Sequence, residues 1–128
     1  MKSAKLAPIV SLLAILASPA LAQEGDVAKG EKAFKKCKAC HMVGDGAKNR
    51  SGPVLNGIVG AGAGLNPDFK YSSALKKAAA DGLVWDEANL TAFLTKPKAF
   101  LKGTKMSFSG FKKESDITNI LAYMATFQ

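Results

Sequence analysis

The chain has 128 residues, with 18 basic and 10 acidic side chains, two cysteines and a single histidine. A chain of this length forms one domain, because domains cluster around roughly 100 to 150 residues. Hydrophobic residues make up 48% and charged residues 22% of the chain, which excludes a disordered tail. The histidine and the two cysteines are one ligand short of a closed structural zinc site, so any metal must be anchored in another way.

The first 22 residues have the pattern of a secretory signal peptide. Two lysines precede an apolar stretch from Leu6 to Ala17, and Ala20-Leu21-Ala22 provides the small residues of a cleavage site. A membrane anchor is the alternative, but the stretch is shorter than the ~20 residues of a spanning helix. We therefore expect a cleaved leader at residues 1–22 and a soluble, exported domain at residues 23–128. Without the two leader lysines, 16 basic and 10 acidic residues give a net charge of +6.

The next expected element is a helix over Asp26–Cys40, with Asp26 as its N-cap, and it ends in Cys37-Lys38-Ala39-Cys40-His41. This pentapeptide has the C-x-x-C-H pattern by which c-type haem is attached. Residues three and four apart share a helix face. Cys37, Cys40 and His41 can therefore address one flat macrocycle, with two thioethers to its vinyl groups and an imidazole to its iron. The motif predicts one covalently attached haem c.

Two other interpretations of the cysteines stay open at this point. A thioredoxin-like enzyme also uses C-x-x-C, but it needs a strand before the motif, and Gly30 to Lys36 is charged and helical. A simple disulfide is the usual outcome for a cysteine pair in an exported protein. It would leave the adjacent histidine unexplained, whereas haem attachment uses all three residues.

Two further helices are expected in the middle of the chain, over Ser72–Ala80 and Glu87–Lys96. Asp86 is the N-cap of the second of these, and Trp85 and Leu90 are spaced as a hydrophobic staple across its start. Pro97 is expected to end it. No strand pattern or internal repeat is evident, so the fold class is all-α.

The segment from Lys98 to Lys112 has no helical or strand period and contains Met106. Irregular segments of this length in compact domains are usually functional. With one histidine in the chain, the second axial ligand of an iron would be a methionine, a lysine or nothing. Met42 adjoins His41 and cannot reach the opposite face of a haem. Met106 is therefore the expected second ligand, and anchoring of the loop in the core is its alternative role.

The last expected helix is Ser115–Thr126, in which Ile117, Ile120, Leu121 and Met124 fall at i, i+3, i+4 and i+7. That spacing is typical of a helix face buried in a core, so Met124 is not expected to bind iron.

A haem whose two axial positions are both occupied by protein ligands is limited to electron transfer. Oxygen, peroxide or a substrate has no free site, and a reversible one-electron change at the iron remains. With His41 and Met106 as ligands, the chain would be an electron carrier and not an enzyme. A haem peroxidase or gas sensor, which needs a free position, and a thiol-disulfide enzyme are the rival functions.

Lysines flank both segments that would meet the haem, and the set consists of Lys35, Lys36, Lys38, Lys98, Lys102, Lys105, Lys112 and Lys113. Such a run is ordinarily a solvated, solubilising surface. Its position around the only redox centre favours docking to acidic partners, because complementary charge can raise association rates ~10 to 10³-fold without tight binding. Nucleic acid is not an expected partner of an exported haem protein.

Together these motifs resemble a class I c-type cytochrome, closest to bacterial cytochrome c2. The residues that carry the resemblance are the haem pentapeptide, Gly52-Pro53, Trp85, Pro97, Gly103-Thr104-Lys105-Met106 and Ile120-Leu121-Ala122-Tyr123. The resemblance covers residues 23–128 and implies the small cytochrome c fold, with four to five helices and long loops wrapped around one covalently bound haem c. It also implies a monomeric periplasmic carrier that takes electrons from a cytochrome bc-type complex to a photosynthetic reaction centre or a terminal oxidase, docking on their acidic surfaces.

The resemblance implies roles for residues outside the ligand set. It makes the carbonyl of Pro53 the acceptor of a hydrogen bond from His41. It makes Tyr71 and Trp85 partners of a haem propionate, and it makes Thr104 a support for the methionine loop.

It also implies that Gly30 packs beside Tyr123, where the first and last helices cross. The chain departs from the family at Ala61, where an arginine usually pairs with a propionate. Phe93 replaces a common tyrosine, and Lys102 replaces the usual proline before Gly103.

Overall fold

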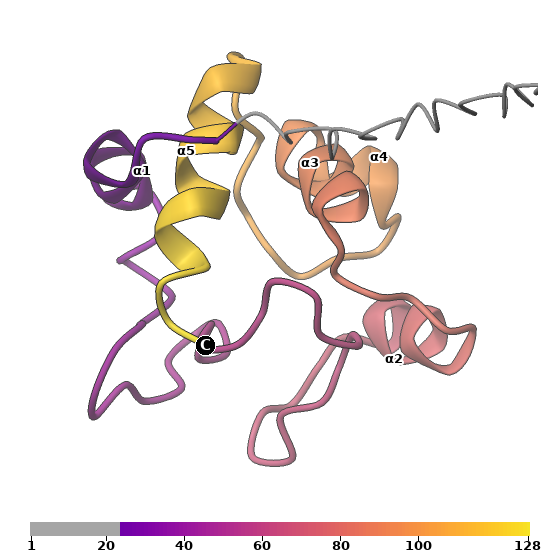
Figure 1. Cartoon of the computed structure of the whole chain (residues 1–128). Helices are drawn as coiled ribbons and strands as arrows, with labels where there is room; N and C mark the ends of the chain where they lie inside the picture. The colour runs from indigo at the N-terminus through magenta and orange to yellow at the C-terminus, as the bar shows by residue number, and fades with distance from the viewer. Residues whose placement is uncertain (1–23) are drawn as a thin grey trace, which may run out of the picture.

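The computed structural model describes residues 24–128 and folds them into five helices joined by long loops (Figure 1). The helices are α1 (Val27–Phe34), α2 (Ser73–Ala80), α3 (Glu87–Thr95), α4 (Pro97–Phe100) and α5 (Glu114–Met124). Over residues 24–128, the only β pairing is one isolated antiparallel bridge between Gly62 and Val84. The predicted all-α fold with four to five helices is confirmed. None of these five helices is both long enough and apolar enough to cross a bilayer. The predicted leader lies outside the described residues.

Three helices begin at a side chain that accepts a free N–H of the first turn. In each case the bonded N–H belongs to the residue three positions further on: the distance is 2.9 Å at Asp26, 3.1 Å at Ser72 and 2.8 Å at Asp86. The first four N–H groups of a helix have no partner within it, so such bonds determine where a helix begins. The predicted starts of α1, α2 and α3 are confirmed to within one residue.

α1 is shorter than predicted. Beyond Phe34 the backbone tightens into bonds between residues three apart, such as Cys37 N to the Phe34 oxygen at 2.8 Å. Phe34 is only 1% exposed, and the chain turns away directly after this buried anchor. This tightening is the 3₁₀ pattern with which many helices end. The prediction of one helix from Asp26 to Cys40 is therefore wrong in its second half.

Pro97 begins a helix as well as following one. α3 ends at Thr95, and Pro97 is the first residue of α4, where the missing N–H removes no helical bond. The prediction that Lys98 to Lys112 lacks a helix is wrong for the part up to Phe100. α5 also begins one residue before the predicted Ser115, and it ends at Met124, two residues before the predicted Thr126.

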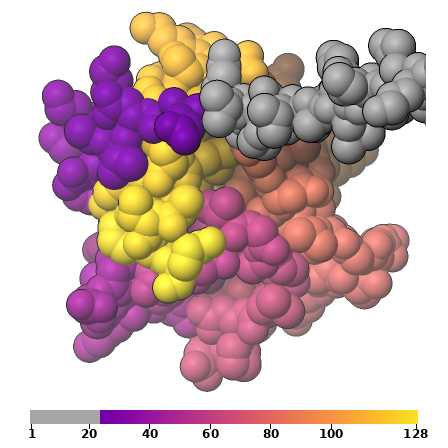
Figure 2. Space-filling model, viewed as in Figure 1, coloured from indigo at the N-terminus to yellow at the C-terminus, as the bar shows by residue number. Residues whose placement is uncertain are grey.

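α1 and α5 cross in close contact, as Figure 1 shows, and their surfaces adjoin in Figure 2. Gly30 lies at the crossing. A Cβ there would collide with the carbonyl oxygen of Asn119 and would lie 2.8 Å from the Cβ of Tyr123. The predicted packing of Gly30 beside Tyr123 is confirmed, because only a residue without a side chain allows this approach.

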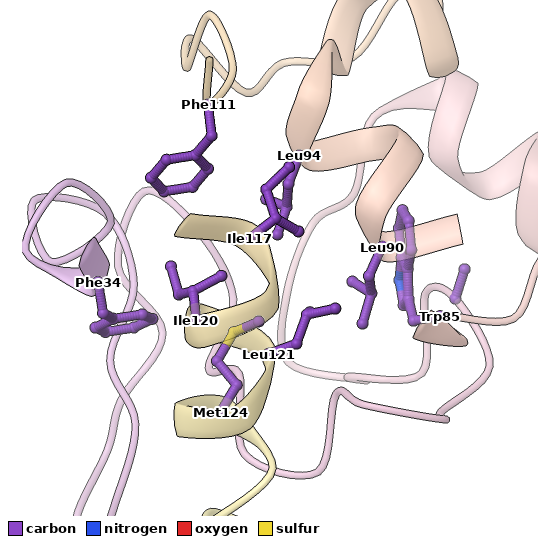
Figure 3. Packing of buried hydrophobic residues seen from close by; sticks show 10 residues of the cluster. Phe34, Trp85, Leu90, Leu94, Phe111, Ile117, Ile120, Leu121 and Met124 are labelled. Atoms are coloured by element: carbon purple, nitrogen blue, oxygen red, sulfur yellow. The ribbon is translucent and has the colours of Figure 1, made fainter. Parts of the chain in front are cut away.

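The hydrophobic core surrounds the inner face of α5. Its residues Ile117, Ile120, Leu121 and Met124 are all buried, and Ile120 is 0% exposed. Figure 3 shows Phe34 of α1 on one side of α5, pointing toward Ile120 and Met124. Leu90 and Trp85 lie on the other side. The predicted assignment of Met124 to the core is confirmed, so it is unavailable to an iron.

Candidate haem-binding site

The three residues of the haem motif lie on one turn of helical backbone. The carbonyl oxygen of Cys37 accepts both the N–H of Cys40 at 3.1 Å and the N–H of His41 at 2.9 Å. Helical bonding is thus present at the motif, although it is not continuous with α1. Both cysteines are free thiols, Cys37 half-buried and Cys40 exposed. The structure therefore does not support the disulfide interpretation.

The thiol of Cys37 is a poor nucleophile in this environment. Burial and, to a lesser degree, the neighbouring Cys40 raise the pKa of Cys37 to about 11, while Lys36 opposes the shift. Thiol-disulfide enzymes need the opposite, a cysteine whose pKa is lowered so that the thiolate forms near neutral pH. In addition, α1 and not a strand precedes the motif. The thioredoxin-like interpretation is therefore disfavoured.

His41 is held in one tautomer. Its Nδ1 lies 2.7 Å from the carbonyl oxygen of Pro53, and because a carbonyl can only accept, Nδ1 carries the proton. Burial lowers the pKa of His41, and the hydrogen bond to Pro53 partly opposes this. The ring is therefore neutral at pH 7, and Nε2 is left with its lone pair. This is the state in which an imidazole binds a metal.

Gly52 packs directly against that ring. A Cβ at position 52 would collide with Cε1 of His41 and would lie 2.7 Å from each ring nitrogen. The N–H of Gly52 donates to the carbonyl of Cys40 at 2.9 Å, and the Arg50 guanidinium donates to the carbonyl of Lys38 at 3.1 Å. The 50–53 segment is thus bonded to the motif turn at three points. Sequence reasoning treated Gly52 only as part of a motif and missed Arg50, because contacts about 12 residues apart leave no local pattern.

The donor set fits a haem better than a bare metal ion. Over residues 24–128, no three His, Cys, Asp or Glu side chains gather as a metal ion would require. One available imidazole nitrogen and two thiols on a single turn instead match a macrocycle tethered at two points and ligated from one side. Apolar side chains pack against the core yet remain partly exposed, and they provide surface that a flat cofactor would cover: Leu55, Ile58, Leu75, Phe93, Phe100 and Phe108.

The segment that carries Met106 is hydrogen-bonded at its C-terminal end and at Met106 itself. The N–H of Phe111 donates to the carbonyl of Leu94 at 2.8 Å, which returns the chain to α3. Gly110 allows this return, since its φ is +113° and a Cβ would collide with the carbonyl oxygen of Thr95. The hydroxyl of Thr104 accepts the N–H of Met106 at 3.2 Å, and Met106 is half-buried. Thr104 therefore supports the backbone of the methionine itself.

Tyr71 and Trp85 occupy different parts of the site. The hydroxyl of Tyr71 accepts the N–H of Asn66 at 3.0 Å, which leaves the phenolic proton to donate elsewhere. Trp85 is 6% exposed and packs against Phe93 with the two rings tilted, at 5.0 Å between the ring centroids. The backbone N–H of Trp85 donates to the carbonyl of Ala61 at 2.7 Å, so the position at which relatives carry an arginine adjoins Trp85. No hydrogen bond among the described residues joins Tyr71 to Trp85.

All eight lysines of the predicted docking set are exposed. The ammonium of Lys36 lies 5.5 Å from the centroid of the Phe111 ring. Lys36 and Lys113 also line a surface hollow of about 470 Å³ together with Lys29 and Lys32. Lys29 and Lys32 were not among the predicted docking residues. Their i, i+3 spacing could have indicated that they share a face with Lys36.

The family model described as cytochrome c matches residues 27–128 of the chain. The chain belongs to the cytochrome c family. Proteins of this family carry covalently attached haem c and transfer electrons instead of catalysing a reaction. The chain is accordingly an electron-transfer protein and not an enzyme, and Cys37, Cys40 and His41 supply the attachment motif.

Within the family, this chain is similar to class I cytochromes that are named cytochrome c2. The chain is 54% identical over 101 residues to cytochrome c2 of Agrobacterium tumefaciens, covering 79% of this chain and 91% of the relative. It is 47% identical over 126 residues to cytochrome c2 of Rhodomicrobium vannielii, covering 98% of this chain and 97% of the relative. The solved structure of cytochrome c2 from Rhodospirillum centenum is 40% identical with a TM-score of 0.76, covering 80% of this chain and 98% of that one.

Proposed function

We propose that this chain is a soluble, periplasmic one-electron carrier whose haem iron is ligated by His41 and Met106. The observation that carries the proposal is the neutral, oriented imidazole of His41, directly after two free cysteines and hydrogen-bonded through Nδ1 to Pro53. When bound, haem c supplies an iron that takes up and releases one electron reversibly. The residues of the chain determine how that iron is held and which molecules reach it.

The motif turn would hold the haem from one side. Cys37 and Cys40 would form its two thioethers, and His41 would present Nε2 to the iron. The bond from Nδ1 to Pro53 keeps the ring in one orientation and raises its basicity, as partners of metal-bound histidines generally do. Gly52 leaves the room that this orientation requires.

The methionine loop would supply the ligand on the other side. Thr104 and the return at Gly110 stabilise the backbone around Met106. A thioether opposite an imidazole raises the reduction potential and leaves no open coordination position. Met106 would thus exclude the chemistry of peroxidases and gas sensors and leave electron transfer.

Tyr71 and Trp85 would hold the haem propionates. The phenolic proton of Tyr71 is free to donate to a carboxylate, since its oxygen already accepts a bond from Asn66. The indole N–H of Trp85 is the second proposed donor. Ala61, next to Trp85, offers no guanidinium, so one propionate would depend more on these two neutral donors.

The exposed lysines would form the partner surface. The eight predicted residues, extended by Lys29 and Lys32 of α1, surround the segments that meet the haem. We propose that they dock on acidic surfaces of membrane redox complexes, namely a cytochrome bc-type complex and a reaction centre or terminal oxidase. Export by the proposed leader at residues 1–22 would bring a monomeric carrier to the periplasm where such surfaces face it.

The test is to produce the full chain in a bacterium with a c-type haem maturation system and isolate it from the periplasm. Mass spectrometry after acid-acetone extraction should find the haem mass retained on a chain that begins at Gln23. The reduced protein should not bind carbon monoxide. A matched Cys37→Ser/Cys40→Ser variant should lose its haem on extraction. Extractable haem in the parent would overturn covalent attachment, and carbon monoxide binding would overturn the carrier assignment.

A further inference from the structure

The peptide group between Pro53 and Val54 is hydrogen-bonded at both of its ends. Its carbonyl oxygen accepts from Nδ1 of His41 at 2.7 Å. Its N–H, which belongs to Val54, donates to Oδ1 of Asn49 at 2.9 Å. The carbonyl and the N–H of one peptide group share a conjugated system. The partner of one end therefore affects the strength of the bond at the other.

Asn49 is itself held by a second asparagine. Nδ2 of Asn66 donates to the same Oδ1 of Asn49 at 2.8 Å, and Oδ1 of Asn66 accepts the N–H of Asp68 at 3.0 Å. These bonds leave one orientation for each amide, because the Val54 and Asp68 N–H groups can only donate. Both asparagines are half-buried, so water competes less with these bonds than it would at an exposed site.

The bonds form a continuous chain from the iron ligand to the Tyr71 loop. They run from His41 through the 53–54 peptide and Asn49 to Asn66, whose backbone N–H donates to the hydroxyl of Tyr71 at 3.0 Å. Successive hydrogen bonds polarise one another, each strengthening the next by roughly 10–30%. Removal of Asn49 would therefore weaken the acceptor of His41 without touching His41.

We propose that Asn49 is a positioning residue that tunes the axial histidine through the Pro53–Val54 peptide. By accepting the Val54 N–H it makes the Pro53 carbonyl a stronger acceptor, which gives His41 more imidazolate character. A more basic imidazole stabilises the ferric iron, so Asn49 lowers the reduction potential. This inference rests on the proposed ligation of iron by His41.

The chain provides a matched control in Asn56. Its side chain makes two bonds to one residue, accepting the N–H of Gly44 at 2.8 Å and donating to the carbonyl of Gly44 at 2.9 Å. Asn56 thus links two points of the same loop, as Asn49 does, but it does not touch the 53–54 peptide. Replacing it tests whether loosening the loop is sufficient to change the haem.

The experiment compares Asn49→Ala with Asn56→Ala in the haem-loaded protein. The reduction equilibrium is measured against a redox mediator, and NMR measures hydrogen exchange at Nδ1 of His41. In Asn49→Ala, the equilibrium constant for reduction should rise roughly two- to fivefold, given charge-assisted bonds and this degree of polarisation. Exchange at Nδ1 should become faster. Both quantities should stay unchanged in Asn56→Ala.

Asn49→Asp is the conservative variant, because a carboxylate still accepts the Val54 N–H. Exchange at Nδ1 should not become faster in it. Asn56→Asp controls for the added charge, and Asn49→Asp should shift reduction to lower potential by more than Asn56→Asp does. If Asn49→Ala does not fold, the comparison of these two aspartate variants tests the proposal by itself.

Three outcomes would overturn the inference. The first is a fall in potential in Asn49→Ala, as expected if water simply enters a loosened site. The second is an equal change in the Asn49 and Asn56 variants. The third is unchanged exchange at Nδ1 in Asn49→Ala. A parent protein without a His41-ligated spectrum would instead refute the proposed function, so the two failures are distinguishable.

Discussion

Gly52 lies against the imidazole of His41 so closely that a Cβ at position 52 would be 2.7 Å from both ring nitrogens. The next residue, Pro53, accepts the Nδ1 proton of the same ring. Two consecutive residues thus determine where the ring can lie and which nitrogen is free. The Gly-Pro pair therefore acts on the proposed iron ligand and does not merely form a turn.

Gly52→Ala should displace the His41 ring. Inserting a methyl group into a packed contact typically destabilises a protein by about 1–3 kcal/mol, and here the strain falls on the ligand. We expect a loss of stability in this range in guanidinium denaturation followed by circular dichroism. An altered haem absorption spectrum should accompany it.

Gly62→Ala is the control for this substitution. A Cβ at position 62 would lie 3.5 Å from Cδ1 of Leu65, an ordinary contact, and the backbone there needs no positive φ. It should leave the haem spectrum unchanged. If both alanine variants lost stability equally with normal spectra, the contact with His41 would not be what matters.

Met106→Ala should remove the weak near-infrared band that arises from sulfur bound to ferric iron. The reduction potential should fall, because methionine raises it, and the reduced protein should gain carbon monoxide binding. Absorption spectra of both oxidation states and a mediated redox titration measure these changes.

The control is Met124→Leu, a change of similar volume at a residue that is 4% exposed in the core. It should keep the band and cost less than about 1.5 kcal/mol of stability. Persistence of the near-infrared band in Met106→Ala would show that another residue binds the iron.

Reversing the charge of Lys102 and Lys105 should slow electron transfer to an acidic partner. Both side chains are exposed on the methionine loop, and complementary fields raise association rates by ~10 to 10³-fold. We expect at least a roughly tenfold slower second-order rate for Lys102→Glu/Lys105→Glu at low salt. The difference should shrink as salt shortens the screening length to ~3 Å at 1 M.

Lys48→Glu/Lys76→Glu is the charge-matched control, since both lysines are exposed but lie outside the proposed docking set. Stopped-flow kinetics with a purified membrane complex would measure the second-order rate of electron transfer for both variants at each salt concentration. An electron-transfer rate that does not change with salt concentration, or equal slowing in both variants, would argue against a docking surface at the methionine loop.

The free energy of unfolding should fall as the pH drops below about 6.5. Burial lowers the pKa of His41 in the folded protein, and an iron bound at Nε2, as proposed, would also keep the proton off the ring, whereas an unfolded, unligated histidine titrates near ~6.5. Below that pH the unfolded chain binds a proton that the folded chain does not. Stability is therefore present above the unfolded pKa and is lost toward the folded one, by up to about 1.36 kcal/mol for each pH unit.

Denaturant titrations between about pH 8 and pH 5 would measure this loss. His41 is the single histidine of the chain, so no other imidazole contributes to the slope. A stability that stays constant over this interval would mean that His41 has the same pKa in both states.

Local patterns predicted much of the chain correctly. Asp26, Ser72 and Asp86 start their helices because a cap bonds to an N–H only three residues away. The i, i+3, i+4, i+7 spacing predicted the buried face of α5, including Met124. The haem motif was recognisable for the same reason, since its three residues must lie on a single turn.

Contacts between segments that are far apart in the sequence could not be predicted from local patterns. α1 ends at Phe34, where the side chain is buried and the chain turns toward the site. The residues directly after Phe34 carry no local signal for the end of a helix. Asn49 and Asn66 are 17 residues apart in the sequence. An asparagine in a loop usually bonds to its own backbone, so neither residue indicates a partner.

The sequence by itself thus determined the helical class and the attachment motif, because each depends on residues within one or two turns of one another. It indicated Met106 as the second candidate ligand by elimination, because the chain has one histidine and few methionines. The bond from His41 to Pro53 and the crossing at Gly30 were expected from the family resemblance and not from any local pattern. Only the tertiary structure decided how closely Gly52 lies against the His41 ring and how the bond chain runs through Asn49 to Asn66. These depend on which loops meet in space. Packing around the core determines which loops meet, and this cannot be predicted from short-range periodicity in the sequence.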